Sequence, residues 1–106
     1  MVRQGRGAQP PTVQMQRIYS IHYDLLSPGQ NYEKLIAAIN RMWPDWAKPL
    51  ESCFIVASTM NAAQIRDSLT PYLDTNDKLL VLRAGSEWAS WNIAKEVTDW
   101  LKRKIV

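Results

Sequence analysis

The sequence contains little of what several common classes of small protein depend on. Cys53 is the only cysteine among 106 residues. One cysteine cannot form an intramolecular disulfide, and a secreted protein of this size would usually carry several. No apolar run approaches the roughly 18 residues that a membrane span requires, and no apolar stretch follows the N-terminal arginines as it would in a secretory signal. We therefore expect a cytoplasmic protein without a membrane partner.

Glycine, histidine and cysteine, which a phosphate-binding loop or a structural zinc site would need, are also scarce. Glycine occurs four times and never in the arrangement of a phosphate-binding loop. A single histidine, His22, and a single cysteine argue against a structural zinc site. A Cys–His nucleophile would require Cys53 and His22 to meet on neighbouring strands. However, the apolar neighbours of Cys53 should raise the pKa of its thiol and keep it unreactive, so we interpret Cys53 as a small core residue.

Positive charge is concentrated at the N-terminus. The formal net charge is +3, and residues 1–15 contain Arg3 and Arg6 but no acid. Outside these two arginines, Lys and Arg exceed Asp and Glu by only one, too little for the broad basic surface of a non-specific nucleic-acid binder. We expect residues 1–15 to form a flexible basic arm, with Arg3, Arg6 and Arg17 as candidates for binding nucleic acid or a partner subunit. A tail without function, cloning-derived residues, and an upstream start codon with Met15 as the usual initiator are the alternatives.

Residues 16–106 have the length and composition of one globular domain. The apolar patterns predict strands over Arg17–Asp24, Ser52–Ala57 and Lys78–Arg83, and a further brief strand at Trp46–Pro49. Helices should begin in capping boxes at Ser27 and at Asn61, each with a glutamine three residues later, and a third helix near Ser90. Pro44 and Pro71 should end the first two helices, because proline lacks the amide hydrogen that a helix needs. Interleaved strands and helices favour one sheet with helices on its face. We predict an α/β (α+β) fold, a ferredoxin-like β-α-β-β-α-β sheet with an added C-terminal helix.

Asp24 is the strongest candidate for chemistry, because it ends the first strand just before a Pro-Gly turn. One carboxylate holds a divalent ion poorly, so Mg²⁺ or Mn²⁺ at Asp24 would need a second copy of Asp24 across a symmetric homodimer. The alternative, which the residue types by themselves favour, is that Asp24 accepts hydrogen bonds from the turn. His22 lies two residues earlier on the same face. It could orient a ligand or shuttle a proton, or it could be a neutral residue of the sheet.

Five tryptophans allow two interpretations. The pairs Trp43 with Trp46 and Trp88 with Trp91 could stack bases or anchor a subunit interface, or they could cover the ends of a small core. Trp100 fits the apolar stripe of the last helix and should be buried. Two acids, Asp74 and Asp77, are expected in a solvated turn.

A family resemblance is visible once these elements are placed. The segments Ile21-His22-Tyr23-Asp24, Ser52-Cys53-Phe54-Ile55-Val56 and Leu73 to Val81 resemble the small CRISPR-associated Cas-two superfamily and its VapD-like relatives. Closer still, Tyr-Asp-Leu…Pro-Gly-Gln-Asn-Tyr, Leu-Glu-Ser, Pro-Tyr-Leu-Asp and Gly-Ser-Glu-Trp-Ala are similar to short bacterial and phage proteins labelled SinR family. The resemblance spans about Met15 to Ser90. It implies a ferredoxin-like homodimer with paired aspartates near the two-fold axis, and Asp24 matches that acid. Ser52 matches a serine that begins a central strand, and Asp77 an acid before the last core strand.

Two functions stay open at this point. The resemblance implies metal-dependent nuclease activity in some relatives, in which Asp24 would bind Mg²⁺ or Mn²⁺ and His22 would assist, in a toxin or defence context. It implies scaffolding in others, so the alternative is a non-catalytic dimeric module that binds nucleic acid or a partner protein. The nearly neutral body and the C-terminal helix, where Cas-two proteins tend to add a strand, argue against a role in spacer integration.

Overall fold

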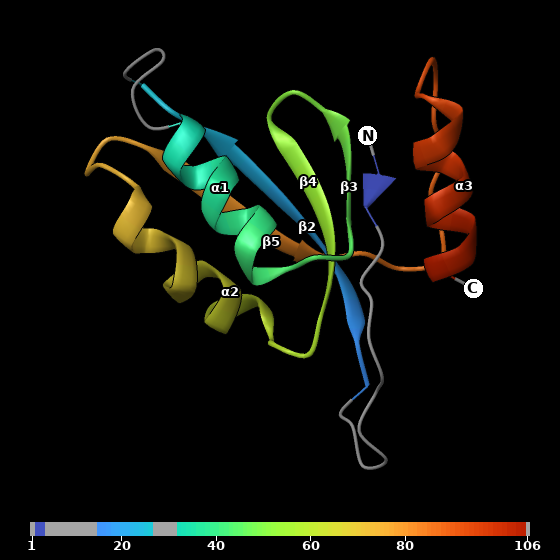
Figure 1. Cartoon of the computed structure of the whole chain (residues 1–106), viewed down its shortest axis with the longest axis horizontal. Coiled ribbons are helices and arrows are strands. Elements are labelled where there is room, and N and C mark those ends of the chain that lie inside the picture. The colour runs from blue at the N-terminus through green and yellow to red at the C-terminus, as the bar shows by residue number, and fades with distance from the viewer. Residues whose placement is uncertain (1, 4–14, 27–31, 106) are drawn as a thin grey trace.

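The computed structural model describes residues 2–3, 15–26 and 32–105. These residues form an α+β fold in which a five-stranded antiparallel sheet, ordered β1-β3-β4-β2-β5, carries helices on both faces (Figure 1). In chain order the elements are β1 (Val2–Arg3), β2 (Arg17–Asp24), α1 (Tyr32–Met42), β3 (Trp46–Leu50), β4 (Cys53–Ser58), α2 (Ala62–Leu69), the 3-10 helix η1 (Thr70–Tyr72), β5 (Lys78–Arg83) and α3 (Lys95–Lys104).

The predicted strands are confirmed, with one shift. β2 and β5 have the predicted bounds, the brief strand exists as β3, and β4 begins and ends one residue later than expected. β4 lies between β3 and β2, which explains its continuous apolar run. Phe54 and Val56 of β4 pack in the core under α1 and α2, and Ala57 packs in the second core on the opposite face. An interior strand that is covered on both sides loses the alternation of polar and apolar residues.

Helices α1 and α2 cover the first face of the sheet (Figure 1). α1 ends at Met42, two residues before Pro44. Asn61 caps α2 in the predicted capping box: its Oδ1 accepts a hydrogen bond from Gln64 N at 2.8 Å, and Gln64 Oε1 accepts one from Asn61 N at 2.8 Å. This exchange satisfies two amides that the first turn of a helix leaves unpaired. The box predicted at Ser27 lies outside the described residues.

The third helix begins later than predicted. α3 starts at Lys95 and not near Ser90, because Asn92 has a positive φ of 58° that a right-handed helix cannot contain. α3 packs on the second face of the sheet through Val97, Trp100 and Leu101. It covers only one end of that face.

A buried carboxylate attaches α3 to the sheet. Asp45 is 6% exposed. Its Oδ1 accepts a hydrogen bond from the Trp100 indole at 2.9 Å, and its Oδ2 forms an ion pair with Lys104. The Asp45 carbonyl also accepts a hydrogen bond from Ala57 N at 3.1 Å, so that the turn after α1 is fixed to β4. A buried charge is tolerated only when it is paired in this way.

Part of the predicted N-terminal arm belongs to the sheet. Val2 pairs with Ala47 and Arg3 with Trp46, so β1 extends the β3 edge of the sheet. This differs from the expectation that residues 1–15 contain no fold element. Arg6 lies outside the described residues. Within the described ranges, every helix is too short and too polar to cross a lipid bilayer.

Candidate functional site

Asp24 is the last residue of β2 and lies at the surface of the protein. It stands directly opposite Lys78 on β5, and its side chain is exposed. A shallow hollow of about 240 Å³ lies beside it and is lined by His22, Tyr23, Asp24, Lys78, Leu79 and Leu80. A ligand in this hollow would therefore meet one carboxylate, one ammonium group and an apolar floor.

Asp77, and not Asp24, accepts the backbone hydrogen bonds of this loop region. Asp77 Oδ1 accepts from Leu26 N at 3.1 Å, and Asp77 Oδ2 accepts from Asp74 N at 2.8 Å. Asp77 therefore does more than occupy a solvated turn, because it ties the turn before β5 to the chain that leaves β2. In the part of the chain that the structure describes, no donor binds the Asp24 carboxylate. The turn that follows Leu26 lies outside the described residues, so the alternative role of Asp24 as an acceptor in that turn stays a prediction.

A metal ion at Asp24 would lack ligands within one copy of the chain. The described residues contain no group of three or more His, Cys, Asp or Glu side chains that could hold an ion. Mg²⁺ takes octahedral oxygen coordination and is usually held by one or two carboxylates together with phosphate oxygens. Asp24 by itself does not fit this requirement, and two copies of Asp24 would come closer to it.

His22 shares a strand face with Asp24 but is engaged elsewhere. His22 Nε2 lies 3.0 Å from Ser20 Oγ, and the Ser20 hydroxyl donates to the Leu82 carbonyl at 3.4 Å. Ser20 and Asp24 lie on opposite sides of His22 along β2, so this bond directs Nε2 away from Asp24. The pair does not form a ready acid–base couple in this conformation.

The structure brings Cys53 and His22 to directly opposite positions on β4 and β2. Cys53 is nevertheless 4% exposed, and burial raises the pKa of its thiol to about 11. Its Sγ contacts the Phe54 carbonyl at 3.8 Å. The prediction that Cys53 is a small core residue is confirmed, and the raised pKa disfavours the thiolate that a nucleophilic cysteine needs.

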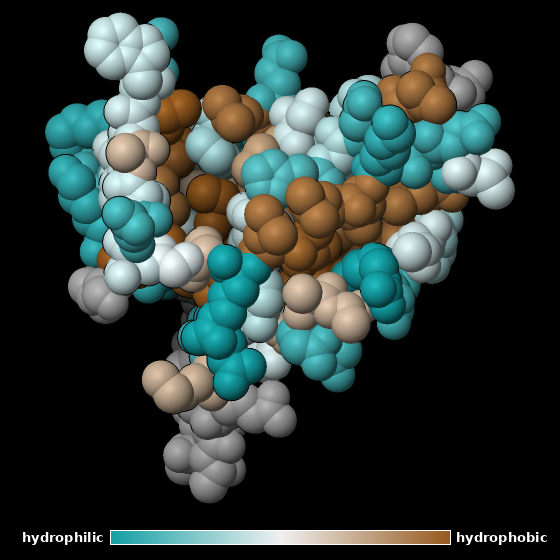
Figure 2. Space-filling model, turned by 180° about the vertical axis from the view of Figure 1, so that it is seen from behind, coloured by the Kyte–Doolittle hydropathy of each residue, from teal (hydrophilic) through white to brown (hydrophobic). Residues whose placement is uncertain are grey.

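A large part of the second sheet face has no helix over it. Leu50, Leu80 and Leu82 are 57%, 56% and 49% exposed, and Figure 2 shows an apolar band that crosses this side of the molecule. We call the surface formed by Ser20, His22, Leu50, Ile55, Leu80 and Leu82 the open face. A groove of about 420 Å³ separates it from α3 and the preceding loop. Sequence patterns did not reveal this surface, because the continuous apolar run of β5 is also expected for a strand that is buried on both sides.

One tryptophan is almost fully exposed, and the other four are buried or partly buried. Trp43, Trp46 and Trp100 are 3%, 4% and 0% exposed, and Trp88 packs against the α3 cluster. Trp91 is 90% exposed. Four of the five tryptophans therefore cover or fill the core, as one of the two interpretations expects.

The predicted binding arginines do not gather around Asp24. Arg17 begins β2 and is exposed. It lies seven residues from Asp24, or about 23 Å along an extended strand. Arg3 belongs to β1 at the far edge of the sheet. Arg83 ends β5 beside Arg17. The sequence analysis did not identify it as a candidate, although the sequence shows a cation at the end of an apolar strand at this position.

Asp24 and His22 thus lie on the second face of the sheet, whereas Arg17 begins β2 at the other end of the strand and shares the face of Tyr19. Comparison with known proteins adds no assignment to this geometry: no family model matches the chain, and no curated protein or solved structure matches it.

Proposed function

We propose that this protein is a homodimeric module that packs through its open face and associates with nucleic acid. The observation that carries the proposal is the exposure of Leu80 and Leu82 on β5, the edge strand beside β2. Exposed apolar patches of this kind mark interaction surfaces. Among the described residues no helix covers this area, which makes it available to a partner.

A second copy is the partner that the chemistry of the open face favours. Between β2 and β5 it is formed by the opposed pairs Ser20 with Leu82 and His22 with Leu80, which include no acid and no Lys or Arg. At one end Asp24 stands opposite Lys78, so a two-fold axis through the face can bring the acid of one copy near the lysine of the other. An isologous interface needs this self-complementarity. A nucleic acid would instead require positive charge along the face.

We further propose that the fold is ferredoxin-like. From β2 to β5 the elements run strand, helix, strand, strand, helix, strand, and the four strands are antiparallel in the order β3-β4-β2-β5. This order of elements is the one expected of the split β-α-β unit. The similarity of the Asp24 and Asp77 segments to Cas-two-like and SinR family proteins adds the expectation of a nucleic-acid partner. The buried free thiol of Cys53 is compatible with a reducing cytoplasm.

Sedimentation equilibrium tests the dimer. Leu82→Lys places a charge on the β5 side of the open face, where the dimer would bury it without a partner of opposite charge. We expect wild type to sediment as a dimer at micromolar concentration and Leu82→Lys to dissociate at least tenfold more readily. Met15→Lys is the matched control, because Met15 is 84% exposed and lies outside the open face. A monomeric wild type, or equal dissociation of both variants, contradicts the proposal.

A metal-dependent endonuclease is the second candidate, and the state of Asp24 favours it. Asp24 is exposed, accepts no hydrogen bond within the described residues, and lies on the strand face that a second copy would cover. Two such carboxylates near a two-fold axis would provide the second ligand that one copy lacks. A Mg²⁺ or Mn²⁺ ion there would polarise a phosphate and help to generate the attacking hydroxide, and His22 would lie two residues away.

Cleavage of labelled RNA and DNA, with Mg²⁺, with Mn²⁺ and with EDTA, tests this candidate. We expect Asp24→Asn to abolish any metal-dependent cleavage, and Asp67→Asn to leave it unchanged because Asp67 is an exposed acid on α2 paired with Arg66. Equal cleavage by wild type and Asp24→Asn excludes Asp24 as the metal ligand. Absence of cleavage by wild type leaves the non-catalytic dimer as the function.

A further inference from the structure

The groove between the open face and α3 has its floor on one face of the sheet. Ser20 of β2 stands opposite both Ile55 of β4 and Leu82 of β5, and His22 stands opposite Cys53. All five residues line the groove. Directly opposed residues project on the same side of a sheet, so these side chains share the second face. The groove therefore continues the open face toward α3.

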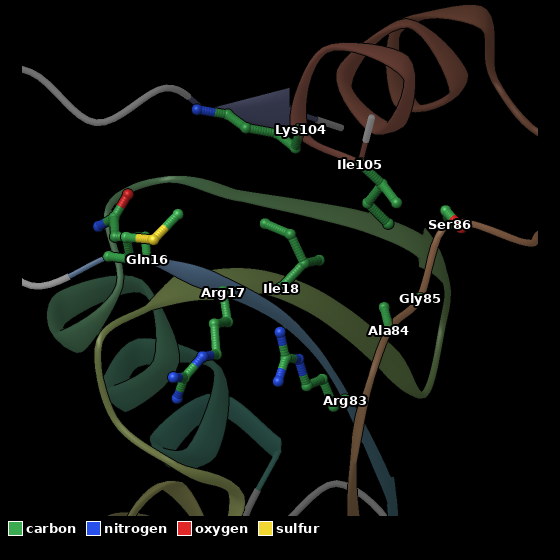
Figure 3. Close-up of a pocket in the computed structure, with 10 residues that line it drawn as sticks. Gln16, Arg17, Ile18, Arg83, Ala84, Gly85, Ser86, Lys104 and Ile105 are labelled. Atoms are coloured by element: carbon green, nitrogen blue, oxygen red, sulfur yellow. The ribbon is translucent and has the colours of Figure 1, made fainter.

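The opposite wall of the groove comes from α3 and from the loop of residues 84–94 that precedes it. The large apolar side chains of this wall are Trp88, Ile93, Leu101 and Ile105. They belong to the cluster on the second face or pack against it. Figure 3 shows the chain leaving β5 through Ala84 and Gly85 toward α3. Figure 2 shows apolar atoms at the bottom of a hollow beside the apolar band. Floor and wall thus face the same space, and one ligand can contact both.

Trp91 lies in this loop but does not fill the groove. Its side chain is 90% exposed, and it is absent from the lining, to which its neighbours Trp88 and Ile93 belong. The chain bends at Trp91 and Asn92, where Asn92 has a positive φ of 58°. An exposed indole therefore stands immediately beside an open apolar groove of the same chain.

The size and charge of the groove suit an indole ring from another molecule. The volume of about 420 Å³ falls within the range of about 300–1,000 Å³ that is usual for small-ligand sites, and an indole ring is smaller than most ligands of such sites. The charged residues of the lining are Arg83 and Glu87, one of each sign. An uncharged, apolar occupant is therefore favoured over a phosphate or a peptide rich in one charge.

The floor also offers an acceptor for the indole N–H, which a buried tryptophan usually needs. The Ser20 hydroxyl donates to the Leu82 carbonyl at 3.4 Å, and His22 Nε2 lies 3.0 Å from Ser20 Oγ. A hydroxyl oxygen has two lone pairs, so Ser20 Oγ can accept one more hydrogen bond when His22 occupies the other lone pair.

We propose that, in the homodimer, Trp91 of each copy inserts into the groove of the other copy. This inference rests on the proposed homodimer and names the residue that anchors its interface. Trp91 and the groove belong to the same surface of one chain, so a two-fold axis that passes between them places each ring in the partner's groove. Tryptophans that fill a pocket of the partner are common among the residues that dominate binding.

Sedimentation equilibrium of Trp91→Ala tests whether the dimer depends on the ring. Because Trp91 is exposed, the monomer should fold without it. We expect the dissociation constant of the dimer to rise by at least about tenfold, as it does when an anchor residue of an interface is truncated. Met15→Ala is the matched control, because it removes another exposed apolar side chain outside the open face and the groove. It should change the dissociation constant by less than about twofold.

Fluorine NMR of protein that contains fluorotryptophan tests the insertion itself. Trp91→Phe lacks one of the five tryptophan signals and thereby assigns the signal of Trp91. The signal of an exposed ring shifts between H₂O and D₂O, whereas the signal of a buried ring does not. We expect this solvent shift at Trp91 in the dilute monomer and its loss in the concentrated dimer.

The outcomes separate the insertion of Trp91 from the dimer through the open face. Leu80→Lys tests the open face by itself, because Leu80 does not line the groove. A dimer that Leu80→Lys weakens and Trp91→Ala does not, or one whose Trp91 signal keeps its solvent shift, overturns the insertion and leaves the open-face dimer. A dimer that needs Trp91 and tolerates Leu80→Lys does the reverse. A monomeric wild type contradicts both.

Discussion

His22 on β2 and Leu80 on β5 stand directly opposite each other in the middle of the sheet face that α3 leaves uncovered. The His22 side chain is half-buried, and the Leu80 side chain is 56% exposed. Around them the surface has no formal charge, and the nearest charged residues in the register, Asp24 and Lys78, face each other at its end. A surface that is uncharged around this pair, with an acid opposite a lysine at its end, can pack against the same surface of a second copy.

The ion pair between Asp45 and Lys104 should be a main attachment of α3. In Asp45→Asn the charge partner of Lys104 is lost, although the amide oxygen can still accept the Trp100 indole hydrogen. Because Lys104 is 26% exposed, we expect a loss of about 1–3 kcal/mol in the free energy of unfolding, below the roughly 3–5 kcal/mol for breaking a fully buried pair. Urea denaturation measures this.

Asp99→Asn is the control for that prediction. Asp99 pairs with Lys95 on the exposed side of the same helix, and an exposed pair contributes little. We expect Asp99→Asn to leave the free energy of unfolding nearly unchanged. If Asp45→Asn costs no more than Asp99→Asn, the ion pair does not hold α3 in place.

Asp77 should stabilise the loop region beside Asp24 through its two backbone hydrogen bonds. In Asp77→Ala the amides of Leu26 and Asp74 lose their acceptor. We expect a loss of about 1–2 kcal/mol and faster hydrogen exchange at the Leu26 amide. Asp67→Ala, which removes an exposed helical acid, should leave that amide unchanged. An unchanged Leu26 exchange rate in Asp77→Ala would mean that the loop is held by other contacts.

Stability should fall at alkaline pH because of two buried groups. Burial raises the pKa of Cys53 from 9.0 to about 11. The pKa of Tyr23 is raised from 10.0 to about 12, mainly by burial and to a lesser extent by the charges of Cys53, Tyr32 and Glu51. In each case the unfolded chain loses its proton first, so the folded state binds more protons and its stability decreases as pH rises. The contribution is complete below about pH 9 and is lost between about pH 9 and 12.

Thermal unfolding from pH 8 to pH 12 measures this dependence. A shift of two pKa units corresponds to about 2–3 kcal/mol for each group. Cys53→Ala should remove the part of the loss that begins near pH 9 and leave the part due to Tyr23, whose hydroxyl donates to the Glu51 carbonyl at 2.9 Å. A wild type with constant stability up to pH 11 would show that the thiol is accessible to water.

Local sequence patterns predicted the elements well and the long-range contacts poorly. The bounds of β2 and β5, the capping box of Asn61 and the stop at Pro44 depend on neighbouring residues, which a single sequence displays. The roles of Asp45 and Asp77 depend on partners 55 and 51 residues away, and no spacing rule connects such positions.

The candidate sites divide in the same way. Asp24 was identified because a strand end before a turn is a local signal. Arg83 was missed because its meaning depends on its position beside Arg17 across two strands. The open face was missed because apolar strands predict a buried sheet, and only the short reach of α3 leaves part of the sheet exposed.

The distance between two spin labels tests the dimer through the open face most directly. Asp24→Cys places a label on the side of the open face, and Lys34→Cys places one on α1, on the opposite side of the sheet. The buried Cys53 thiol should remain unlabelled. If two open faces meet, the two labels at position 24 are separated by a sheet spacing of about 10 Å plus their lateral offset. The two labels at position 34 should then lie farther apart by about 20 Å, because the α1 helix layers of both copies add to the separation. Shorter distances at position 34 than at position 24, or no measurable pair at either position, would contradict the account.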